Sequence, residues 1–381
     1  MENIIISAII SFILTFYAIP IIIMVANSKK LFDHPDARKI HLTPIPSLGG
    51  FGIFAGFLVA LLLMAEINAV SQGFQYYIAA FLITFFVGMK DDVLVISPMK
   101  KFIGQLVVAV ILMFKANLLI VTMHGFMGVG VIHPTFSYFL TGLTILVIMN
   151  AFNLIDGIDA LATSIGIITT SVFSLFFFFN DDMFFALMGF TFAASLLAFL
   201  IYNFSPARIF MGDTGSMLLG LVNAILVIRF IETAESSNIF PLLGSPAMGF
   251  GILALPLLDT LRVFGIRILH ARSPFSPDRN HLHHILLDKG LSHTSVTLIL
   301  SLATIIMIVL TYIALPIGTT KVILGQIVLF FSCITVLTQV RPKMKGMKVI
   351  KNHELDENEL SRKVRDIFSY NENSAKTSEK D

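Results

Sequence analysis

Long apolar runs that can each cross a lipid bilayer as a helix are the feature that most limits how this chain folds. About twenty apolar residues span the ~30 Å hydrocarbon core of a bilayer, and runs of about this length recur along the sequence. Hydrophobic residues make up 56% of the 381 residues and charged residues only 13%, whereas a soluble domain carries about 25% charged residues. The sequence therefore predicts an integral membrane protein.

The pattern predicts an all-α polytopic fold, because the apolar runs do not alternate in short strands as in a membrane β-barrel. Hydropathy places eleven spans, and a polar turn from Asn180 to Asp182 separates the sixth from the seventh; fusing these two gives ten. The expected spans cover residues 3–26, 48–66, 75–89, 102–121, 137–150, 162–179, 183–202, 215–231, 246–269, 294–315 and 321–340.

The positions of Lys and Arg predict which side of the membrane each loop faces, since loops rich in these residues stay in the cytoplasm. With eleven spans, all 26 basic residues except Lys115, Arg229 and Lys321 fall on one side. We therefore expect the N-terminus outside and the C-terminus in the cytoplasm. We also expect two parts, a membrane-embedded domain over residues 1–340 and a charged cytoplasmic tail over 341–381.

Composition also bears on the partners of the chain. The net charge is only +2, and the sequence has 36 Phe and no Trp, so it lacks the basic surface that nucleic-acid binding requires. Nothing in the sequence identifies the oligomeric state, and a homodimer is compatible with it.

Five polar segments interrupt the apolar pattern, all on the predicted cytoplasmic side. The first runs from Arg38 to Gly50, where two glycines open the next span and backbone amides at such a helix start can face phosphate. The second contains Asp91 and Asp92 at the end of the third span, and charges at a membrane boundary are candidates for function. Lys101 and Gln105 follow one helical turn apart, so they share a face.

The third segment, residues 150–159, closes the fifth span without any basic residue. Asn153, Asp156 and Asp159 recur at every third position, which in a helix would form a ridge of oxygen ligands, and Gly157 would allow a bend. Oxygen ligands without cysteine favour Mg²⁺ or Mn²⁺ over zinc. The fourth segment, with Gly212 and Asp213, begins the eighth span, where a carboxylate and free amides can cap a helix or hold a metal–phosphate complex.

The fifth segment is the long loop from Arg272 to His284. Arg279 and the three histidines His281, His283 and His284 lie beside two prolines, without the spacing of a zinc-protease helix. We interpret this loop as an anion clamp, because arginine offers a planar fork to phosphate oxygens and histidine a donor near neutral pH. We interpret Asp259 and Arg262, three residues apart in the ninth span, as a structural ion pair.

These groups together indicate phosphoryl transfer at the cytoplasmic face of a membrane. Carboxylates for a divalent cation and donors for phosphates let a protein position the reactants and neutralise charge. Catalysis at the lipid boundary implies one membrane-borne substrate and one soluble substrate. A lipid phosphate acceptor and a nucleotide-sugar donor satisfy that requirement.

The ordered motifs resemble those of the polyprenyl-phosphate N-acetylhexosamine-1-phosphate transferases. The resemblance extends from the Arg38 loop to His284 and includes Asp91-Asp92, the segments 150–159 and 210–216, and Pro277 to His284. Residues 281–284 match the His-x-His-His form of the family branch that acts on undecaprenyl phosphate and UDP-N-acetylglucosamine. The peptidoglycan branch carries three consecutive histidines, which this chain lacks.

The resemblance implies a Mg²⁺-dependent transfer of N-acetylglucosamine-1-phosphate from a UDP-sugar to undecaprenyl phosphate in the bacterial cytoplasmic membrane, with release of UMP. It implies that Asn153 and Asp213 hold the metal and that Asp91 and Asp92 lie near the lipid phosphate. Asp156 and Asp159 would organise the donor and the metal. The residues expected at the phosphate and sugar end are Lys101, Gly212, Arg279, His281, His283 and His284.

Two alternatives stay open from the sequence. The first is the same reaction with another UDP-N-acetylhexosamine, because sugar selection leaves no readable motif. The second is an ion-coupled transporter, since intramembrane acids also mark transport pathways. Transporter acids lie near the middle of the bilayer, whereas here they cluster at span ends, which favours the transferase. Whether the lipid phosphate attacks directly or through a covalent carboxylate intermediate is open as well.

Overall fold

The computed structural model describes residues 1–29, 31, 45–65, 73–94, 96–235, 237, 244–271 and 280–339. The chain divides into a unit of Met1–Arg341 and a second unit of Pro342–Asp381, and the second lies outside the described residues. Most of the Arg38 loop, Arg279 and the tail predicted over 341–381 therefore lie outside them too.

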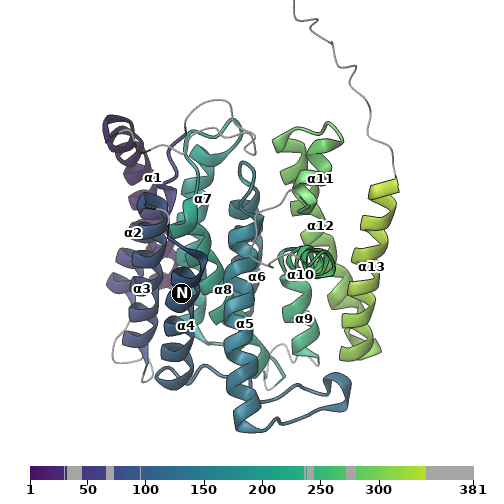
Figure 1. Cartoon of the computed structure of the whole chain (residues 1–381). Coiled ribbons are helices and arrows are strands. Elements are labelled where there is room, and N and C mark those ends of the chain that lie inside the picture. The colour runs from purple at the N-terminus through teal and green to yellow at the C-terminus, as the bar shows by residue number, and fades with distance from the viewer. Residues whose placement is uncertain are drawn as a thin grey trace, which may run out of the picture. The chain divides into compact units, whose positions relative to one another are not determined.

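Helices account for nearly all of the described chain, apart from one antiparallel bridge between Thr122 and Val131 (Figure 1). The α-helices are α1 (Glu2–Lys29), α2 (Gly49–Met64), α3 (Phe74–Leu94), α4 (Pro98–Phe114), α5 (Pro134–Ile155), α6 (Leu161–Phe179), α7 (Met183–Asn203), α8 (Gly212–Thr233), α9 (Ser245–Ile252), α10 (Ala254–Leu269), α11 (Leu282–Asp288), α12 (His293–Ala314) and α13 (Thr319–Gln339). Two 3-10 turns, Phe126–Gly128 and Leu315–Ile317, complete the set.

The prediction of an all-helical membrane protein is confirmed. Seven helices in the described ranges are long and apolar enough to cross a bilayer: α1, α5, α6, α7, α8, α12 with its 3-10 extension, and α13. Helix is also present in the other four ranges where spans were expected. The total of eleven spans and the orientation of the termini stay predictions.

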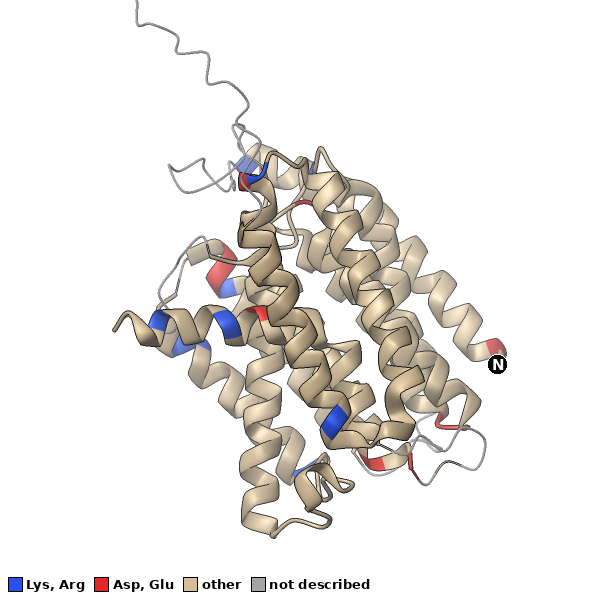
Figure 2. Cartoon of the chain, turned by 90° about the vertical axis from the view of Figure 1, so that its right-hand side faces the viewer, with Lys and Arg blue, Asp and Glu red and all other residues tan. Residues whose placement is uncertain are grey.

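The ninth expected span, residues 246–269, is wrong as one continuous helix. The helix is interrupted at Leu253, which ends α9 and precedes α10. α10 is viewed nearly along its axis in Figure 1 and lies across the bundle in Figure 2, whereas its neighbours run lengthwise. Asp259, Arg262 and Arg267 of α10 are buried while Leu261 and Ile268 are exposed. The polar side of α10 therefore packs into the protein, which hydropathy averaged over the segment could not reveal.

Local sequence explains where several helices begin and end. Pro98 and Pro134 occupy the first turns of α4 and α5, where a missing N–H costs nothing because that group has no partner within the helix. The turn from Asn180 to Asp182 separates α6 from α7, as predicted, and Asp181 adopts a left-handed conformation with φ 58°. Asp and Asn tolerate this conformation better than most residues.

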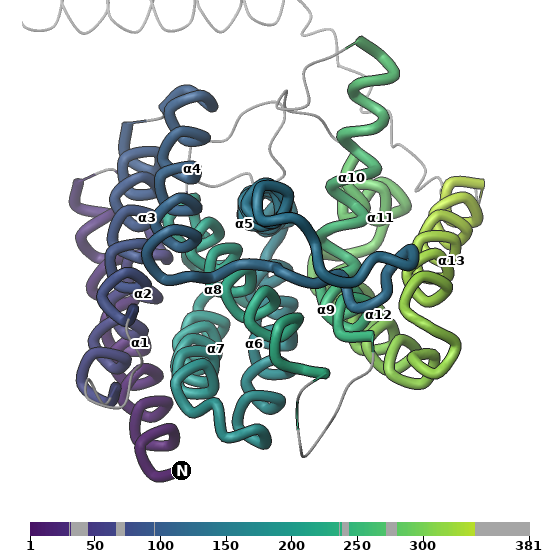
Figure 3. Tube along the Cα trace, turned by 90° about the horizontal axis from the view of Figure 1, so that it is seen from below, coloured from purple at the N-terminus to yellow at the C-terminus, as the bar shows by residue number. Residues whose placement is uncertain are grey.

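α8 is the central helix of the described bundle. Of its most apolar eighteen-residue stretch 94% is buried, against 17% for α1 and for α12. It packs on α2, α3, α5 and α6, so α8 carries its terminal polar groups within the protein while α1 and α12 expose apolar side chains. Viewed from below in Figure 3, the segment between α4 and α5 crosses the end of the bundle as far as α13, where Met127 N–H donates to Thr320 Oγ1 over 2.7 Å.

Charged residues of the described helices lie mainly at helix ends and along α10, and the middles of the other helices are nearly free of them (Figure 2). One end of the bundle holds the Asp91 end of α3 and the Asp213 end of α8, which pack against each other. This arrangement places the residues of separate polar segments near one another.

We predict that Gly88→Ala destabilises the fold. A Cβ at Gly88 would lie 2.4 Å from the Cα of Thr214, so α3 would have to move away from α8, and overpacking of this kind costs about 1–3 kcal/mol. Thermal unfolding in detergent measures the loss. Gly265→Ala in α10 is the matched control, because nothing lies within 4 Å of its Cβ position; equal effects of the two variants would contradict the close approach.

Candidate active site

Four side chains from four helices converge where α3, α4, α5 and α8 meet. Lys101 Nζ lies 3.3 Å from Asp91 Oδ2 and 2.8 Å from Asp213 Oδ2, and it donates to Asn153 Oδ1 over 3.1 Å. Asn153 in turn donates to Asp213 Oδ1 and, over 2.9 Å, to Ser216 Oγ. We call Asp91, Lys101, Asn153 and Asp213 the carboxylate–lysine cluster. It confirms that the second, third and fourth polar segments meet in space.

Each member of this cluster is fixed by its helix. Asp91 lies in the last turn of α3 and accepts a hydrogen bond from Ile96 N–H over 2.8 Å, which closes the turn toward α4. Lys101 lies in the first turns of α4, and Gln105 one turn later accepts from Asn150 Nδ2 over 2.9 Å. The lysine and the glutamine therefore share a face directed at α5, as the sequence predicts.

Asp92 has a different role from its neighbour, because it caps α8. Its carboxylate accepts from Asp213 N–H over 2.7 Å, from Thr214 N–H over 3.0 Å and from the Thr214 hydroxyl over 2.5 Å. The N-cap residue of α8, Met211, makes no side-chain cap, so Asp92 satisfies amides that would otherwise lack partners. Gly212 begins α8 with φ +70°, and a Cβ there would meet Ser47 O and Asp92.

The amides of Gly49 and Gly50 are occupied by backbone carbonyls, so they are not free to bind a phosphate, which the sequence left as one possibility. Gly49 N–H donates to Phe210 O over 2.9 Å and Gly50 N–H to Met211 O over 2.8 Å. The glycine pair instead ties the start of α2 to the segment that leads into α8. The first polar segment thus supports the fourth, at least over its described residues.

The oxygen ridge predicted for residues 153–159 is also wrong, because α5 ends at Ile155. Asn153 lies in the last turn, Asp156 is the C-cap, and Asp159 lies in the following turn with different partners. Burial, together with the negative charges of Asp213 and Asp92, raises the pKa of Asp156 to about 8. Asp156 therefore interacts electrostatically with Asp213 of the carboxylate–lysine cluster.

Asp159 is directed away from that cluster, toward α12. Its Oδ1 lies 3.3 Å from His293 Nδ1, and its backbone carbonyl accepts from the Thr297 hydroxyl over 2.8 Å. Burial alone would raise the pKa of Asp159, but hydrogen bonds and charge from His293 and hydrogen bonds from Ser205 and Ala207 hold it below its ordinary value. Asp159 is thus ionised and joins the active-site loop to α12.

The histidines of the fifth segment pack against a carboxylate of α10. Asp259 Oδ2 lies 2.9 Å from His281 Nδ1, and Asp259 Oδ1 accepts from Arg262 over 2.9 Å and from Leu282 N–H over 3.1 Å. The rings of His281 and His283 are stacked at 5.7 Å, and both side chains are buried. We call Asp259, Arg262, His281 and His283 the histidine cluster.

The two clusters are joined through residues 153–157. A Cβ at Gly157 would lie 2.3 Å from His283 Nε2, and Gly157 follows Asn153 by four residues. Burial, reinforced by the neighbouring His284 and His281, lowers the pKa of His283 to about 3. His283 is therefore neutral near pH 7 and offers one N–H donor; His281 Nε2 and both ring nitrogens of His283 make no hydrogen bond to the described residues.

The sequence did not predict that Asp259 and His293 contact candidate site residues. The ion pair of Asp259 with Arg262 is confirmed, but Asp259 also orients His281, which lies 22 residues further on. The available signal was its position among three charged residues in a span that was predicted to lie in the membrane. His293 had no local signal, because its partner Asp159 lies on another element.

The chemistry of the carboxylate–lysine cluster fits a divalent cation. The ammonium of Lys101 lies among three oxygens of Asp91, Asn153 and Asp213 at 2.8–3.3 Å, which shows that these oxygens converge on one positive charge. Carboxylate and amide oxygens are the ligands Mg²⁺ accepts, usually with several waters retained. Among the described residues, no three Asp, Glu, His or Cys side chains group as a metal site by themselves, so the amide of Asn153 is needed.

Comparison with known proteins identifies the family. The chain is 33% identical over 313 residues to decaprenyl-phosphate N-acetylglucosaminephosphotransferase of Mycobacterium leprae, covering 76% of this chain and 78% of the relative. The sequence pattern of glycosyl transferase family 4 matches residues 74–231. The chain belongs to this family. Two further relatives are undecaprenyl-phosphate alpha-N-acetylglucosaminyl 1-phosphate transferases. The one from Yersinia pestis is 30% identical, and the match covers 72% of this chain and 74% of the relative. The one from Escherichia coli is 29% identical, and the match covers 73% of this chain and 75% of the relative.

The match to the glycosyl transferase family 4 pattern includes the whole carboxylate–lysine cluster. Asp91, Lys101, Asn153 and Asp213 all lie between residues 74 and 231. The histidine cluster lies beyond that range. α10 and α11 place it at the same end of the bundle.

The raised pKa of Asp156 predicts a pH-dependent stability. Because the pKa rises from near 4 to about 8, the folded protein favours the protonated carboxyl. This contribution to stability is present below about pH 4 and is lost as the pH rises through 8. In EDTA, the stability of Asp156→Asn relative to the unsubstituted protein should therefore rise by on the order of 4 kcal/mol from pH 5 to pH 9, since about three pKa units of the shift fall in this window and one unit is about 1.4 kcal/mol. A difference in unfolding temperature that does not change with pH would contradict this assignment.

Asp259→Asn should destabilise the protein by about 3 kcal/mol. It leaves the buried Arg262 without its carboxylate, and removal of one partner from a buried ion pair costs about 3–5 kcal/mol. Asp181→Asn is the control, because Asp181 is exposed and surface changes usually stay within about 0.5 kcal/mol. Denaturant unfolding in detergent compares the two; a loss of equal size in both variants would refute a structural role for Asp259.

Proposed function

We propose that this chain transfers N-acetylglucosamine-1-phosphate from UDP-N-acetylglucosamine to undecaprenyl phosphate and releases UMP. The printed names of the relatives support a polyprenyl phosphate acceptor and N-acetylglucosamine phosphate as the group transferred. The finer choices, undecaprenyl over decaprenyl lipid and N-acetylglucosamine over another UDP-N-acetylhexosamine, are part of this proposal and rest on the resemblance of residues 281–284 to the His-x-His-His branch of the family.

One observation carries the proposal: the convergence of Asp91, Asn153 and Asp213 oxygens on the ammonium of Lys101. Phosphoryl transfer needs a site where positive charge is held against phosphate oxygens and the reactants are aligned. This cluster supplies one fixed cation and a set of oxygens suited to another. It lies at helix ends, where a lipid phosphate and a soluble nucleotide can meet.

In the proposed reaction an oxygen of the lipid phosphate attacks the phosphorus that bears the sugar. A new P–O bond joins the two phosphates, and the bond between that phosphorus and the bridging oxygen of UDP breaks, so that UMP leaves with the electron pair. A phosphate monoester, with its second pKa near ~6, is already largely ionised at neutral pH. Direct attack therefore requires little help from a general base, and Asp91 would position the acceptor.

We assign Asn153 and Asp213 as ligands of Mg²⁺ or Mn²⁺, which would neutralise charge on the donor diphosphate when bound. Lys101, between Asp91 and Asp213, would contribute a second positive charge to the phosphates. Asp92 acts indirectly, because its carboxylate fixes the start of α8 and with it Asp213. Asp159 likewise acts through the loop that it holds against α12.

The donor sugar and diphosphate would extend toward the histidine cluster. His281 and His283 present ring nitrogens without partners in the described chain, and Asp156 and Gly157 lie between them and Asn153. We also place His284 and Arg279 at this end, Arg279 from the sequence alone. The predicted loop charges support a bacterial cytoplasmic membrane protein with this site on the cytoplasmic face.

The reaction is tested by UMP release from purified protein with undecaprenyl phosphate, Mg²⁺ and one of several UDP-sugars. We expect release with UDP-N-acetylglucosamine and its loss in EDTA. Asp213→Asn should lower the rate at least about 100-fold, a loss typical for a group that stabilises developing charge, whereas Asp91→Asn should retain a measurable rate. Glu2→Gln, an exposed carboxylate on α1, is the control and should leave the rate unchanged.

The outcomes separate the alternatives. Release only with another UDP-N-acetylhexosamine would keep the mechanism and change the sugar. Complete loss in both Asp91→Asn and Asp213→Asn, with donor binding retained, would contradict the division of roles between these residues. No release with any donor, together with solute flux across sealed vesicles, would favour the transporter alternative.

A further inference from the structure

A polar cavity lies at the opposite end of the bundle from the carboxylate–lysine cluster. It has a volume of about 520 Å³ and is lined by the ends of α1, α2, α3, α7 and α8 and by residues that follow α4. Arg229 in its wall and Asp213 lie on the same helix, sixteen residues apart, which is about 24 Å along the axis. The proposed transfer reaction makes no use of this cavity.

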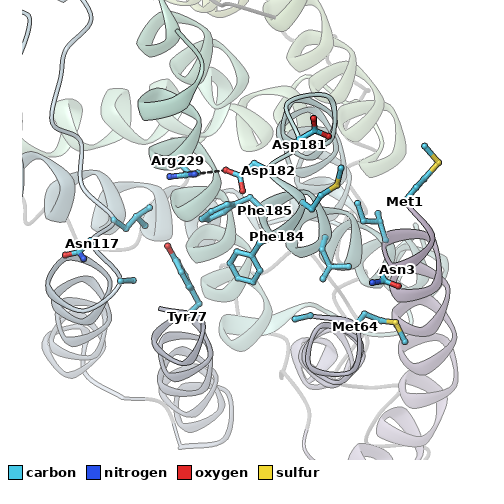
Figure 4. A pocket seen from close by; sticks show the side chains of 16 residues that line it. Met1, Asn3, Met64, Tyr77, Asn117, Asp181, Asp182, Phe184, Phe185 and Arg229 are labelled. Atoms are coloured by element: carbon cyan, nitrogen blue, oxygen red, sulfur yellow. Dashed lines mark hydrogen bonds and ion pairs between the residues drawn. The ribbon is translucent and has the colours of Figure 1, made fainter. Parts of the chain in front are cut away.

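An ion pair at the start of α7 gives the cavity charges of both signs. Arg229 Nε and Nη2 lie 2.9 Å and 2.8 Å from Asp182 Oδ2, and the guanidinium stacks over the Phe185 ring at 5.1 Å (Figure 4). No hydrogen bond to another described residue uses Asp182 Oδ1 or the remaining guanidinium N–H groups. Both charges are thus fixed in place and retain capacity for a ligand.

Tyr77 adds a hydroxyl donor beside this pair. Its side chain is 7% exposed and its ring packs edge-on against Phe185 at 5.9 Å. Figure 4 shows the hydroxyl directed at the space beneath Arg229 and Asp182. Within the described chain no side chain or backbone group hydrogen-bonds to this hydroxyl, so it is available to a ligand. An acceptor on a ligand would satisfy it.

The charges and the apolar lining together restrict the ligand. The charged groups in the wall include Asp181, Asp182, Arg229 and the amino group of Met1. The negative charges disfavour a purely anionic ligand, and the positive charges disfavour a simple cation. Phe184, Phe185 and other apolar side chains form the rest of the lining. The size falls within the ~300–1,000 Å³ range of small-molecule sites. A zwitterion attached to an apolar chain fits all of these properties.

We propose that this cavity binds the headgroup of a phospholipid that carries a phosphodiester and a primary amine, that is, phosphatidylethanolamine. The phosphate accepts hydrogen bonds from Arg229 and Tyr77, and the ammonium donates to Asp182, with Asp181 nearby. The acyl chains leave along the apolar lining. A quaternary ammonium has no N–H donor for the carboxylate, so phosphatidylcholine satisfies the site less well.

The test is a binding titration of delipidated full-length protein in detergent, followed by native mass spectrometry. The probes are six-carbon-chain forms of phosphatidylethanolamine, phosphatidylcholine and phosphatidylglycerol. We expect the ethanolamine lipid to bind about tenfold more tightly than the other two. Tyr77→Phe, which removes only the hydroxyl, should weaken this binding about tenfold, and Asp182→Asn should remove the preference over phosphatidylglycerol.

Tyr138→Phe is the matched control, because Tyr138 lies outside the cavity and stacks on Phe114 at 4.6 Å; its binding should equal that of the unsubstituted protein. Equal or tighter binding of phosphatidylglycerol or phosphatidylcholine would overturn the proposal. So would the same affinity in the Tyr77→Phe and Tyr138→Phe proteins. Unfolding temperatures verify that both variants are folded, and UMP release from them tests the transfer reaction independently.

Discussion

The interaction on which the rest of the site depends is the contact of Lys101 with three oxygens from three other helices. Buried or half-buried carboxylates near one another repel, and in a membrane protein little water is available to reduce that repulsion. A single ammonium between Asp91 and Asp213 offsets it and fixes the ends of α3, α4, α5 and α8 at one point. The same positive charge would suit a phosphate substrate, so in the proposed function the group that holds the helices together also serves the chemistry.

Two further carboxylates, Asp92 and Asp259, support the site but do not belong to the carboxylate–lysine cluster. Asp92 binds the first amides of α8, and α8 is buried along nearly its whole length, so movement of its start would disturb the bundle. Asp259 orients His281 from α10, a helix that lies across the others with its polar side inward. These carboxylates have their oxygens occupied by protein donors. Carboxylates adjacent in sequence or similar in composition thus differ in role according to which donors surround them.

The two ends of α8 illustrate how one buried helix serves two polar regions. Asp213 at its start lies in the carboxylate–lysine cluster, and Arg229 near its end pairs with Asp182. Between them the helix is almost entirely apolar and buried. Charged groups are confined to the ends of the helix, where partners or water can satisfy them. This separation leaves a cavity with charges of both signs far from the proposed transfer reaction.

The sequence by itself determined that the chain is a helical membrane protein, where most helices lie, and which polar segments are candidates for the chemistry. Those conclusions rest on local composition, since a run of apolar residues has the same preference wherever it lies. Only the tertiary structure decided that Asp92 caps α8, that Asp159 turns toward His293, and that α10 breaks from α9 and buries its charges. Such contacts join residues from about 20 to more than 130 positions apart. They depend on how the helices pack, and no local periodicity records it.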